Sequence, residues 1–264
     1  MQKKMLLCCG AAGVFGSFGL FARWLQVMSV FEEDTGLARR GAPQSLAVLV
    51  ICVVAVFALA LAVRYLKDYR IGARPQEAMA HSSKIYPLLM LLAGLLMAAG
   101  SLLRLVNADT PTRILAIWGV ASAFAYAYFP VAPRREGTGS ALSILVVLFF
   151  CFWLVVFYRE NSGDPVMWNY VLEMLALVVV TLAFYYMAGF LFYRAKLLRT
   201  IYSALLAVFL CMTALGGELG LAWSLILAGS ALTLLTLAGV IILNLKDGGT
   251  AAEENPPAAP SEEE

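Results

Sequence analysis

The stretch VMWNYVLEMLALVVVTLAFYYMAGFLF, residues 166–192, decides the fold. An α-helix needs about 20 predominantly apolar residues to cross the hydrocarbon core of a bilayer, and this stretch supplies them. Its apolar residues are continuous and do not alternate with polar ones, so a helix is favoured over a strand of a membrane β-barrel. One carboxylate, Glu173, interrupts the run. The stretch therefore predicts a transmembrane helix that carries an acidic group.

The whole chain has a similar composition. Of its 264 residues, 62% are apolar and 14% are charged, whereas soluble domains have about 45–50% and about 25%. A soluble fold could not bury that much apolar surface, and a disordered chain would be far more polar. Soluble and disordered proteins are therefore excluded, and the lipid bilayer is the expected partner.

The hydropathy pattern predicts an all-α polytopic membrane helix bundle with about eight transmembrane helices. Residues 1–243 form this single domain, and if residues 200–215 do not cross, the count is seven. The predicted spans are 5–28, 45–63, 85–106, 114–131, 140–158, 166–192, 200–215 and 219–243.

The basic residues predict the orientation, because cytoplasmic loops carry an excess of Lys and Arg. With the N-terminus and the C-terminus both cytoplasmic, 13 of the 19 basic residues lie on the inner side and every lysine is among them. Short loops and the lack of an N-x-[ST] acceptor favour the bacterial plasma membrane. Residues 244–264 are rich in acidic residues and proline, and we expect a disordered cytoplasmic tail there.

Glu173 is the strongest candidate for a functional residue. It lies about seven residues into its predicted span, roughly 10 Å deep, and an intramembrane carboxylate is costly unless it is paired, protonated or facing water. Arg23 and Arg104 are candidate partners at similar depth, and Gln26 and Asn169 could complete a polar cluster. One interpretation is an outward-facing cavity for a solute or a proton. The other is a structural ion pair, or a protonated glutamate, that locks two helices together.

Glycine recurs at every third position of the first span. Small residues allow the backbones of membrane helices to approach closely. Gly10, Gly13, Gly16 and Gly19 therefore predict a helix-packing seam, with a ligand channel as the alternative.

Signals for enzymatic chemistry are lacking in the sequence. The chain has five cysteines, none in a C-x-x-C pair, and the single histidine His81, whereas a zinc or iron–sulfur site needs three or four clustered ligands. We predict no metal, no cofactor and no enzymatic activity. A net charge of +2 gives no reason to expect nucleic-acid binding.

The segment after the first span carries a resemblance. The residues Trp24-Leu25-Gln26, Phe31-Glu32 and Thr35-Gly36-Leu37, followed by Pro43, resemble the W-L-Q…F-E-x-x-T-G-L segment of a group of bacterial polytopic membrane proteins. The resemblance covers about 20 residues. It implies a membrane location and transfers no functional residue.

Two classes of function are compatible with these features. The buried charge favours a small-solute or ion permease with an outward polar cavity around Glu173. The alternative is a non-enzymatic membrane scaffold, a regulator, or a subunit of a larger membrane complex, with a membrane-protein partner or a second copy of the chain.

Overall fold

The computed structural model describes residues 2–30, 42–72, 74–81, 83–106, 109–132, 137–163 and 170–247. Within these ranges the chain forms eight long α-helices, one short 3-10 helix and two strands of two residues. The elements are α1 Gln2–Val30, α2 Pro43–Arg64, β1 Tyr69–Arg70, η1 Pro75–Met79, α3 Ile85–Leu105, α4 Thr110–Tyr128, α5 Thr138–Asn161, α6 Val171–Leu191, α7 Leu197–Ala214, α8 Leu221–Leu243 and β2 Lys246–Asp247.

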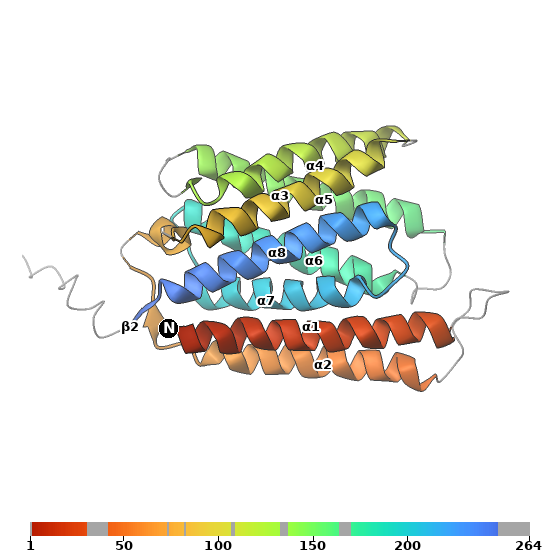
Figure 1. The fold of residues 1–264 in the computed structure, drawn as a ribbon, viewed down its shortest axis with the longest axis horizontal. Helices are drawn as coiled ribbons and strands as arrows, with labels where there is room; N and C mark the ends of the chain where they lie inside the picture. Colours follow the sequence, from red (N-terminus) through yellow and green to blue (C-terminus); the bar gives the residue numbers. More distant parts are fainter. Residues whose placement is uncertain are drawn as a thin grey trace, which may run out of the picture.

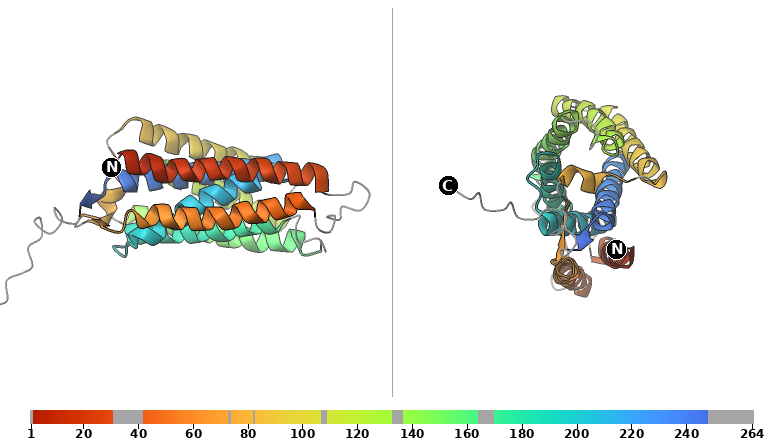
Figure 2. Two further views of the ribbon diagram at one scale, coloured as in Figure 1. Left: turned by 90° about the horizontal axis from the view of Figure 1, so that it is seen from below. Right: turned by 90° about the vertical axis from the view of Figure 1, so that its left-hand side faces the viewer.

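Six of these helices form a closed ring. Each helix from α3 to α8 packs on the next one in the chain, and α8 packs back on α3. The ring is visible end-on in the right panel of Figure 2. The helices α1 and α2 form a hairpin that lies outside the ring against α7 (Figure 1).

Glycines allow α8 to close the ring against α3. A Cβ atom at Gly229 of α8 would lie 2.7 Å from the carbonyl oxygen of Ala93 in α3. A Cβ atom at Gly100 of α3 would lie 2.5 Å from the carbonyl oxygen of Ala222 in α8. Both contacts are with backbone atoms, which cannot rotate away. Close approach of backbones is a main source of attraction between helices in lipid, where the hydrophobic effect between them is absent.

Aromatic side chains fill the interior of the ring. Helices that are not neighbours in the ring meet through them: the ring centroids of Trp153 in α5 and Trp223 in α8 are 4.5 Å apart, and those of Tyr126 in α4 and Phe184 in α6 are 5.5 Å apart. The Tyr126 hydroxyl also hydrogen-bonds Ser230 Oγ of α8 at 3.1 Å. The interior of the ring is therefore packed with side chains at these positions.

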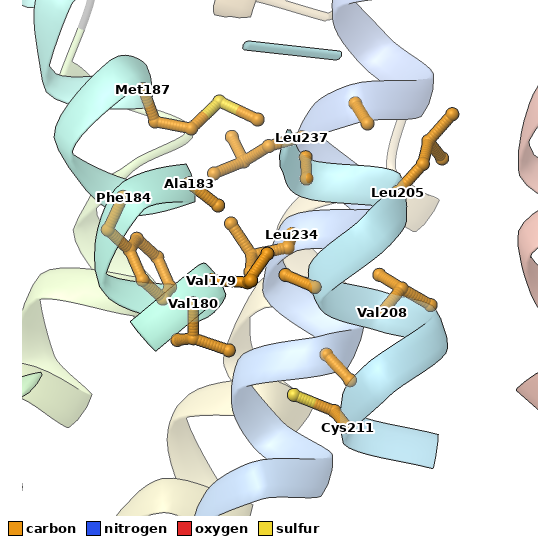
Figure 3. Packing of buried hydrophobic residues seen from close by; sticks show 14 of the residues in the cluster. Val179, Val180, Ala183, Phe184, Met187, Leu205, Val208, Cys211, Leu234 and Leu237 are labelled. Carbon is orange, nitrogen blue, oxygen red and sulfur yellow. The ribbon is translucent and has the colours of Figure 1, made fainter. Parts of the chain in front are cut away.

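Aliphatic side chains complete the packing between α6, α7 and α8. Figure 3 shows Ala183 and Met187 of α6 near Leu237 of α8, whereas Leu205 and Val208 lie on the other side of α7. All five side chains are buried. The helix α8 is the most enclosed of the eight, and α1 and α2 are the most peripheral.

The outer surface of the bundle is apolar. Large side chains such as Phe57, Leu88, Phe124, Val155 and Tyr185 are exposed around the bundle, where water would make them costly and lipid tails would not. The protein is a multi-pass membrane helix bundle, as its composition predicts.

Seven of the eight described helices are long and apolar enough to span a membrane. The helix α7, which overlaps the uncertain span 200–215, is among them, and α4 is not. The sequence marks residues 200–215 as the uncertain span, but the helix that is not apolar enough to span is α4. Thr110 and Arg113 lower the mean hydropathy of α4, yet α4 lies alongside α3 and α5 for its whole length (Figure 1).

Residues 75–80, here called the inner strap, cross the ring at the end where the N-terminus and β2 lie (Figure 2). Gln76 Nε2 donates a hydrogen bond of 3.1 Å to the carbonyl oxygen of Leu191 at the end of α6. On the other side, Asn244 Nδ2 donates to the carbonyl oxygens of Ala78 at 3.0 Å and Ala80 at 2.6 Å. The strap is thus anchored to α6 and to α8. We call this end of the bundle the inner end, because eight exposed basic side chains lie there: Arg64, Lys67, Arg70, Arg74, Lys84, Arg194, Lys196 and Arg199.

The start of the predicted tail is part of the fold. Asn244 holds the inner strap, and Lys246 and Asp247 form β2, which pairs antiparallel with Tyr69 and Arg70 of β1. The prediction of disorder from residue 244 is therefore wrong for residues 244–247, because backbone pairing and the Asn244 amide supply contacts that composition does not reveal. Residues 248–264 lie outside the described ranges.

Ring closure can be tested with glycine-to-alanine variants. Gly229→Ala forces a Cβ atom against the backbone of α3, so we expect it to destabilise the bundle by about 1–3 kcal/mol. Gly10→Ala is the control, since a Cβ atom there would meet no atom within 4 Å. Thermal unfolding in detergent micelles measures both. Equal melting temperatures for the two variants would contradict the proposed closure.

Candidate functional site

A buried ion pair joins the hairpin to the ring at the outer end of the bundle. Arg23 lies near the C-terminal end of α1, and Glu173 lies in the first turn of α6. Arg23 Nη2 is 3.3 Å from Glu173 Oε1, and the two side chains are only 1% and 4% exposed. The sequence predicted this pairing as one of two, and the structure brings the two residues together.

Gln26 extends the cluster to α2. Arg23 Nη1 donates a hydrogen bond of 2.9 Å to Gln26 Oε1, one helical turn further along α1. Gln26 Nε2 in turn donates to Ser45 Oγ in the first turn of α2 at 2.9 Å. Three helices therefore share one chain of polar contacts, which we call the outer polar cluster: Arg23, Gln26, Ser45 and Glu173.

A glycine turn covers the outer polar cluster. The turn after α7 contains Gly216 and Gly217, and the Gly217 amide donates to the carbonyl oxygen of Ala214 at 2.9 Å. A Cβ atom at Gly217 would collide with Glu173 Oε1, and a Cβ atom at Gly216 would collide with the carbonyl oxygen of Leu20. The stretch is a tight turn, and the absence of side chains at its two glycines lets it cover the pair.

Glu173 lies closer to the end of its helix than the sequence predicted. The described helix α6 begins at Val171, so Glu173 is its third residue. The sequence predicts a span from residue 166, whereas the described helix starts five residues later. A carboxylate in the first turn is stabilised by the positive end of the helix dipole. The position of Glu173 therefore favours its charged form more than a site two turns inside the helix would.

Arg104 does not belong to this cluster. Its Nη2 donates to Glu160 Oε1 at 2.8 Å, and its guanidinium carbon lies 4.2 Å from the ring centroid of Trp223. The prediction of Arg104 as a partner of Glu173 is wrong, because similar depth in the membrane does not make two helices neighbours. The helix α3 packs on α4 and α8, whereas α1 packs on α2 and α7. Asn169, the fifth predicted member, lies outside the described residues.

The glycine seam of α1 is shorter than predicted. A Cβ atom at Gly19 would collide with Thr213 Oγ1, and one at Gly16 would lie 2.6 Å from Met212 Sδ. A Cβ atom at Gly10 or Gly13 would meet nothing within 4 Å. Residues three apart are rotated by about 60° around a helix, so four glycines at this spacing cannot all face α7.

The second carboxylate oxygen of Glu173 differs from the first, which pairs with Arg23. Glu173 Oε2 is buried and accepts no hydrogen bond from the residues that the structure describes. A buried acceptor without a donor costs about 1–3 kcal/mol, and more when it is charged. A proton, or a donor on a bound solute, would satisfy this oxygen. The site can therefore hold a positive charge or a hydrogen-bond donor beside Arg23.

Charge pairs elsewhere on the outer end are open to solvent. Arg159 Nη2 and Asp109 Oδ2 are 3.0 Å apart, with side chains 66% and 53% exposed. Hydrogen bonds from Thr112, with a smaller effect of Arg159, lower the pKa of Asp109. In the described ranges, no three His, Cys, Asp or Glu side chains come together as a metal site would require.

The fold and the site define the protein as a polytopic membrane helix bundle with a buried ion pair near one end of the bundle. No family model matches the chain, and no curated protein or solved structure shows significant similarity to it. The resemblance of the segment after the first span therefore stays a prediction, and most of that segment, residues 31–41, lies outside the described residues.

The ion pair can be tested with a double-mutant cycle. Arg23→Gln or Glu173→Gln alone leaves a buried charge without its partner, so each should cost about 3 kcal/mol of stability. The double variant leaves no unpaired charge and should recover part of the loss. Chemical unfolding in mixed micelles measures all four proteins, and the exposed pair Arg159→Gln with Asp109→Asn serves as the control. Strictly additive losses at Arg23 and Glu173 would show that the two residues do not interact.

The glycine turn gives a second test. Gly217→Ala should push the Glu173 carboxylate away from Arg23 and lower the stability by about 1–3 kcal/mol. Gly220→Ala in the same connection is the matched control, because a Cβ atom there has open space. The effect of Gly217→Ala should disappear in a Glu173→Ala background, where the colliding oxygen is absent. If Gly217→Ala lowers the stability by the same amount in the Glu173→Ala background, the loss comes from the turn itself and not from a collision with Glu173.

Proposed function

We propose that the protein is a permease for a small solute or ion, and that the outer polar cluster closes its outer side. The observation that carries the proposal is the Glu173 carboxylate: one oxygen is paired with Arg23, and the other is buried without a hydrogen bond from the described residues. Ionisable side chains inside membranes are costly, and they commonly mark solute or proton pathways.

The position of the pair supports this proposal. It connects α1, in the peripheral hairpin, with α6, in the ring. Protonation of Glu173 would remove the attraction to Arg23, and so would a cation bound at its free oxygen. Either event would loosen the outer end of the hairpin. The inner end is held separately, because Lys4 Nζ of α1 donates a hydrogen bond to the Tyr69 hydroxyl of β1, and β1 pairs with β2 after α8. The hairpin could then move at one end only, as alternating access requires.

A second candidate function is a non-enzymatic membrane scaffold, a regulator, or a subunit of a larger complex. The specific observation that favours it is the burial of the site, because Arg23 Nη2 and Glu173 Oε1 are 3.3 Å apart and the two side chains are only 1% and 4% exposed. In that case the pair is a structural lock. For either function, the basic inner end favours an orientation with this end in the cytoplasm.

Water accessibility distinguishes the two candidates. Ala176 lies one turn inside Glu173 on α6 and is fully buried, so Ala176→Cys leaves the pair intact. The variant is built in a chain whose five native cysteines are replaced, and intact cells are treated with a membrane-impermeant maleimide. The permease proposal expects slow labelling at position 176, and labelling about tenfold faster after Glu173→Gln, because a path to the outside opens more often.

Three positions provide controls for this experiment. Ser162→Cys is exposed at the outer end and should react at once, whereas Arg70→Cys at the inner end should not react. Ala207→Cys, buried in α7, reports general loosening of the bundle. If position 176 stays unlabelled in both backgrounds while Ser162→Cys reacts, the site is a structural lock and the permease proposal fails.

A further inference from the structure

A short β-ribbon joins the hairpin to the ring at the inner end of the bundle (Figure 1). Its strand β1 follows α2 of the hairpin, and its strand β2 follows α8 of the ring. The strands pair antiparallel, with Tyr69 opposite Asp247 and Arg70 opposite Lys246. The helix α1 reaches the same place, because Lys4 Nζ lies 3.8 Å from the centroid of the Tyr69 ring. Three separate parts of the chain therefore each bring a basic residue to the ribbon.

The strand pairing places two positive charges on one face of the ribbon. Residues directly opposite each other in an antiparallel pair project from the same face, with Cβ atoms about 4.5–5.5 Å apart. Arg70 and Lys246 are such a pair, and both side chains are exposed. Like charges in this arrangement destabilise strand pairing, and strands of two residues each have few other contacts to offset the cost. An anion that binds both side chains would therefore stabilise the ribbon.

The described acidic groups do not neutralise this face. Arg70 forms no ion pair with any residue that the structure describes. The pair between Arg74 and Glu77 is separate, and its atoms are 3.8 Å apart with both side chains largely exposed. The Lys246 side chain extends over the residues that follow β1, since a Cβ atom at Gly72 would lie 3.9 Å from Lys246 Cε. The two charges of the ribbon thus stay close to each other.

The two ends of the bundle differ in how their basic residues are paired. At the outer end Arg23, Arg104 and Arg159 each contact a carboxylate of this chain. At the inner end eight exposed basic side chains are accompanied by only two exposed acidic ones in the described ranges, Asp68 and Glu77. The inner end therefore has an excess of positive charge that a negatively charged partner can neutralise.

We infer that Arg70 and Lys246 bind the phosphate group of an anionic phospholipid of the cytoplasmic leaflet. A guanidinium donates paired hydrogen bonds to phosphate oxygens, and an ammonium group supplies a further positive charge. The cytoplasmic leaflet carries anionic lipids, and each basic residue near its surface strengthens binding by about fivefold. Lys4 adds to the positive potential beside the ribbon. The inference is independent of the proposed transport function.

Exposed apolar side chains favour a lipid over a soluble anion. Leu6 and Leu7 follow Lys4 on α1 and are 70% and 56% exposed. Leu61 lies in the last turn of α2 and Tyr65 directly follows that helix, and both are exposed as well. A phospholipid held at the ribbon by its phosphate could lay its acyl chains along these side chains. A free phosphate or an acidic peptide could not cover them in this way.

Lipid binding is tested on the full-length protein. Native mass spectrometry in detergent counts the lipids that remain bound at each concentration of phosphatidylglycerol or phosphatidylcholine. The two lipids share the phosphate, but the choline group cancels its charge. We expect the first phosphatidylglycerol to bind at least about tenfold more tightly than phosphatidylcholine. Equal affinities for the two lipids would overturn the inference.

Charge-neutralising variants locate the site. Arg70→Gln and Lys246→Gln should each weaken binding of the first phosphatidylglycerol by about fivefold. Arg194→Gln and Lys196→Gln are the matched controls, because both residues are equally exposed at the same end but lie in the connection between α6 and α7. We expect a loss of less than about twofold for each control. Equal losses in all four variants would indicate a diffuse basic surface and overturn the site.

Melting temperatures distinguish binding from a purely structural role of Arg70. Replacing phosphatidylcholine by phosphatidylglycerol should raise the melting temperature of the natural chain, because a ligand that binds the folded state stabilises it. The rise should be smaller for Arg70→Gln. In phosphatidylcholine alone, Arg70→Gln should not lower the melting temperature, because it removes a like-charge repulsion. An equal rise for the two proteins would overturn the inference.

Two other anions are distinguished by further measurements. Inorganic phosphate at the concentration of the lipid should not displace phosphatidylglycerol, and displacement would assign the ribbon to a soluble phosphate. The glutamates among residues 248–264 are also replaced by glutamine in the full-length chain. Phosphatidylglycerol should bind this variant with an affinity that changes by less than about twofold. A gain of about fivefold or more would show that the acidic tail occupies the ribbon, and the inference would fail.

Discussion

The contact of α3 with α8 across Gly100 and Gly229 is the constraint on which the rest of the structure depends. It makes a closed ring out of what would otherwise be an open row of helices. Closure brings α5 opposite α8, so that Trp153 meets Trp223 across the ring, and Tyr126 of α4 meets Phe184 of α6 beside α5. In lipid the hydrophobic effect gives no preference for one helix order over another, so close backbone contact and shape have to provide it.

The polar contacts at the two ends of the bundle have different roles. At the inner end, Gln76 and Asn244 hydrogen-bond backbone carbonyls and hold the strap across the ring. At the outer end, the ion pairs join helices through charged side chains. Neutral amides fix a short backbone segment, whereas charges can be neutralised or exchanged for those of a ligand. This difference is why the proposed function concerns the outer end.

The sequence predicted the class of fold and the most unusual residue well. A long apolar run reveals a transmembrane helix, and a carboxylate inside it stands out, so Glu173 and its partner Arg23 could both be found. The same reasoning failed for Arg104, because depth along a helix says nothing about which helices are neighbours. Trp223 and Glu160 come from helices distant in sequence, and only the closed ring places them beside Arg104.

Some features leave no visible mark in the sequence. Gly100 and Gly229 lie in spans with several other small residues, and nothing local distinguishes them from Gly10 and Gly13, which face open space. Asn244 resembles the polar start of a tail, and its role depends on the strap that lies 160 residues or more earlier in the chain. Whether a polar side chain at the end of a span has a structural role therefore depends on its contacts with residues far away in the sequence.

The inner strap also links the architecture to the order in which the chain is made. The strap leaves the ribosome before α3, but its anchor Asn244 follows α8 and is among the last described residues to be synthesised. The glycine face of α3 likewise has no α8 to pack on until that helix is made, so the ring cannot close before translation is nearly complete. A chain that stops short of α8 would lack both the helix that closes the ring and Trp223, on which Trp153 stacks. Completion of the last helix is therefore the step that separates a finished molecule from an unfinished one.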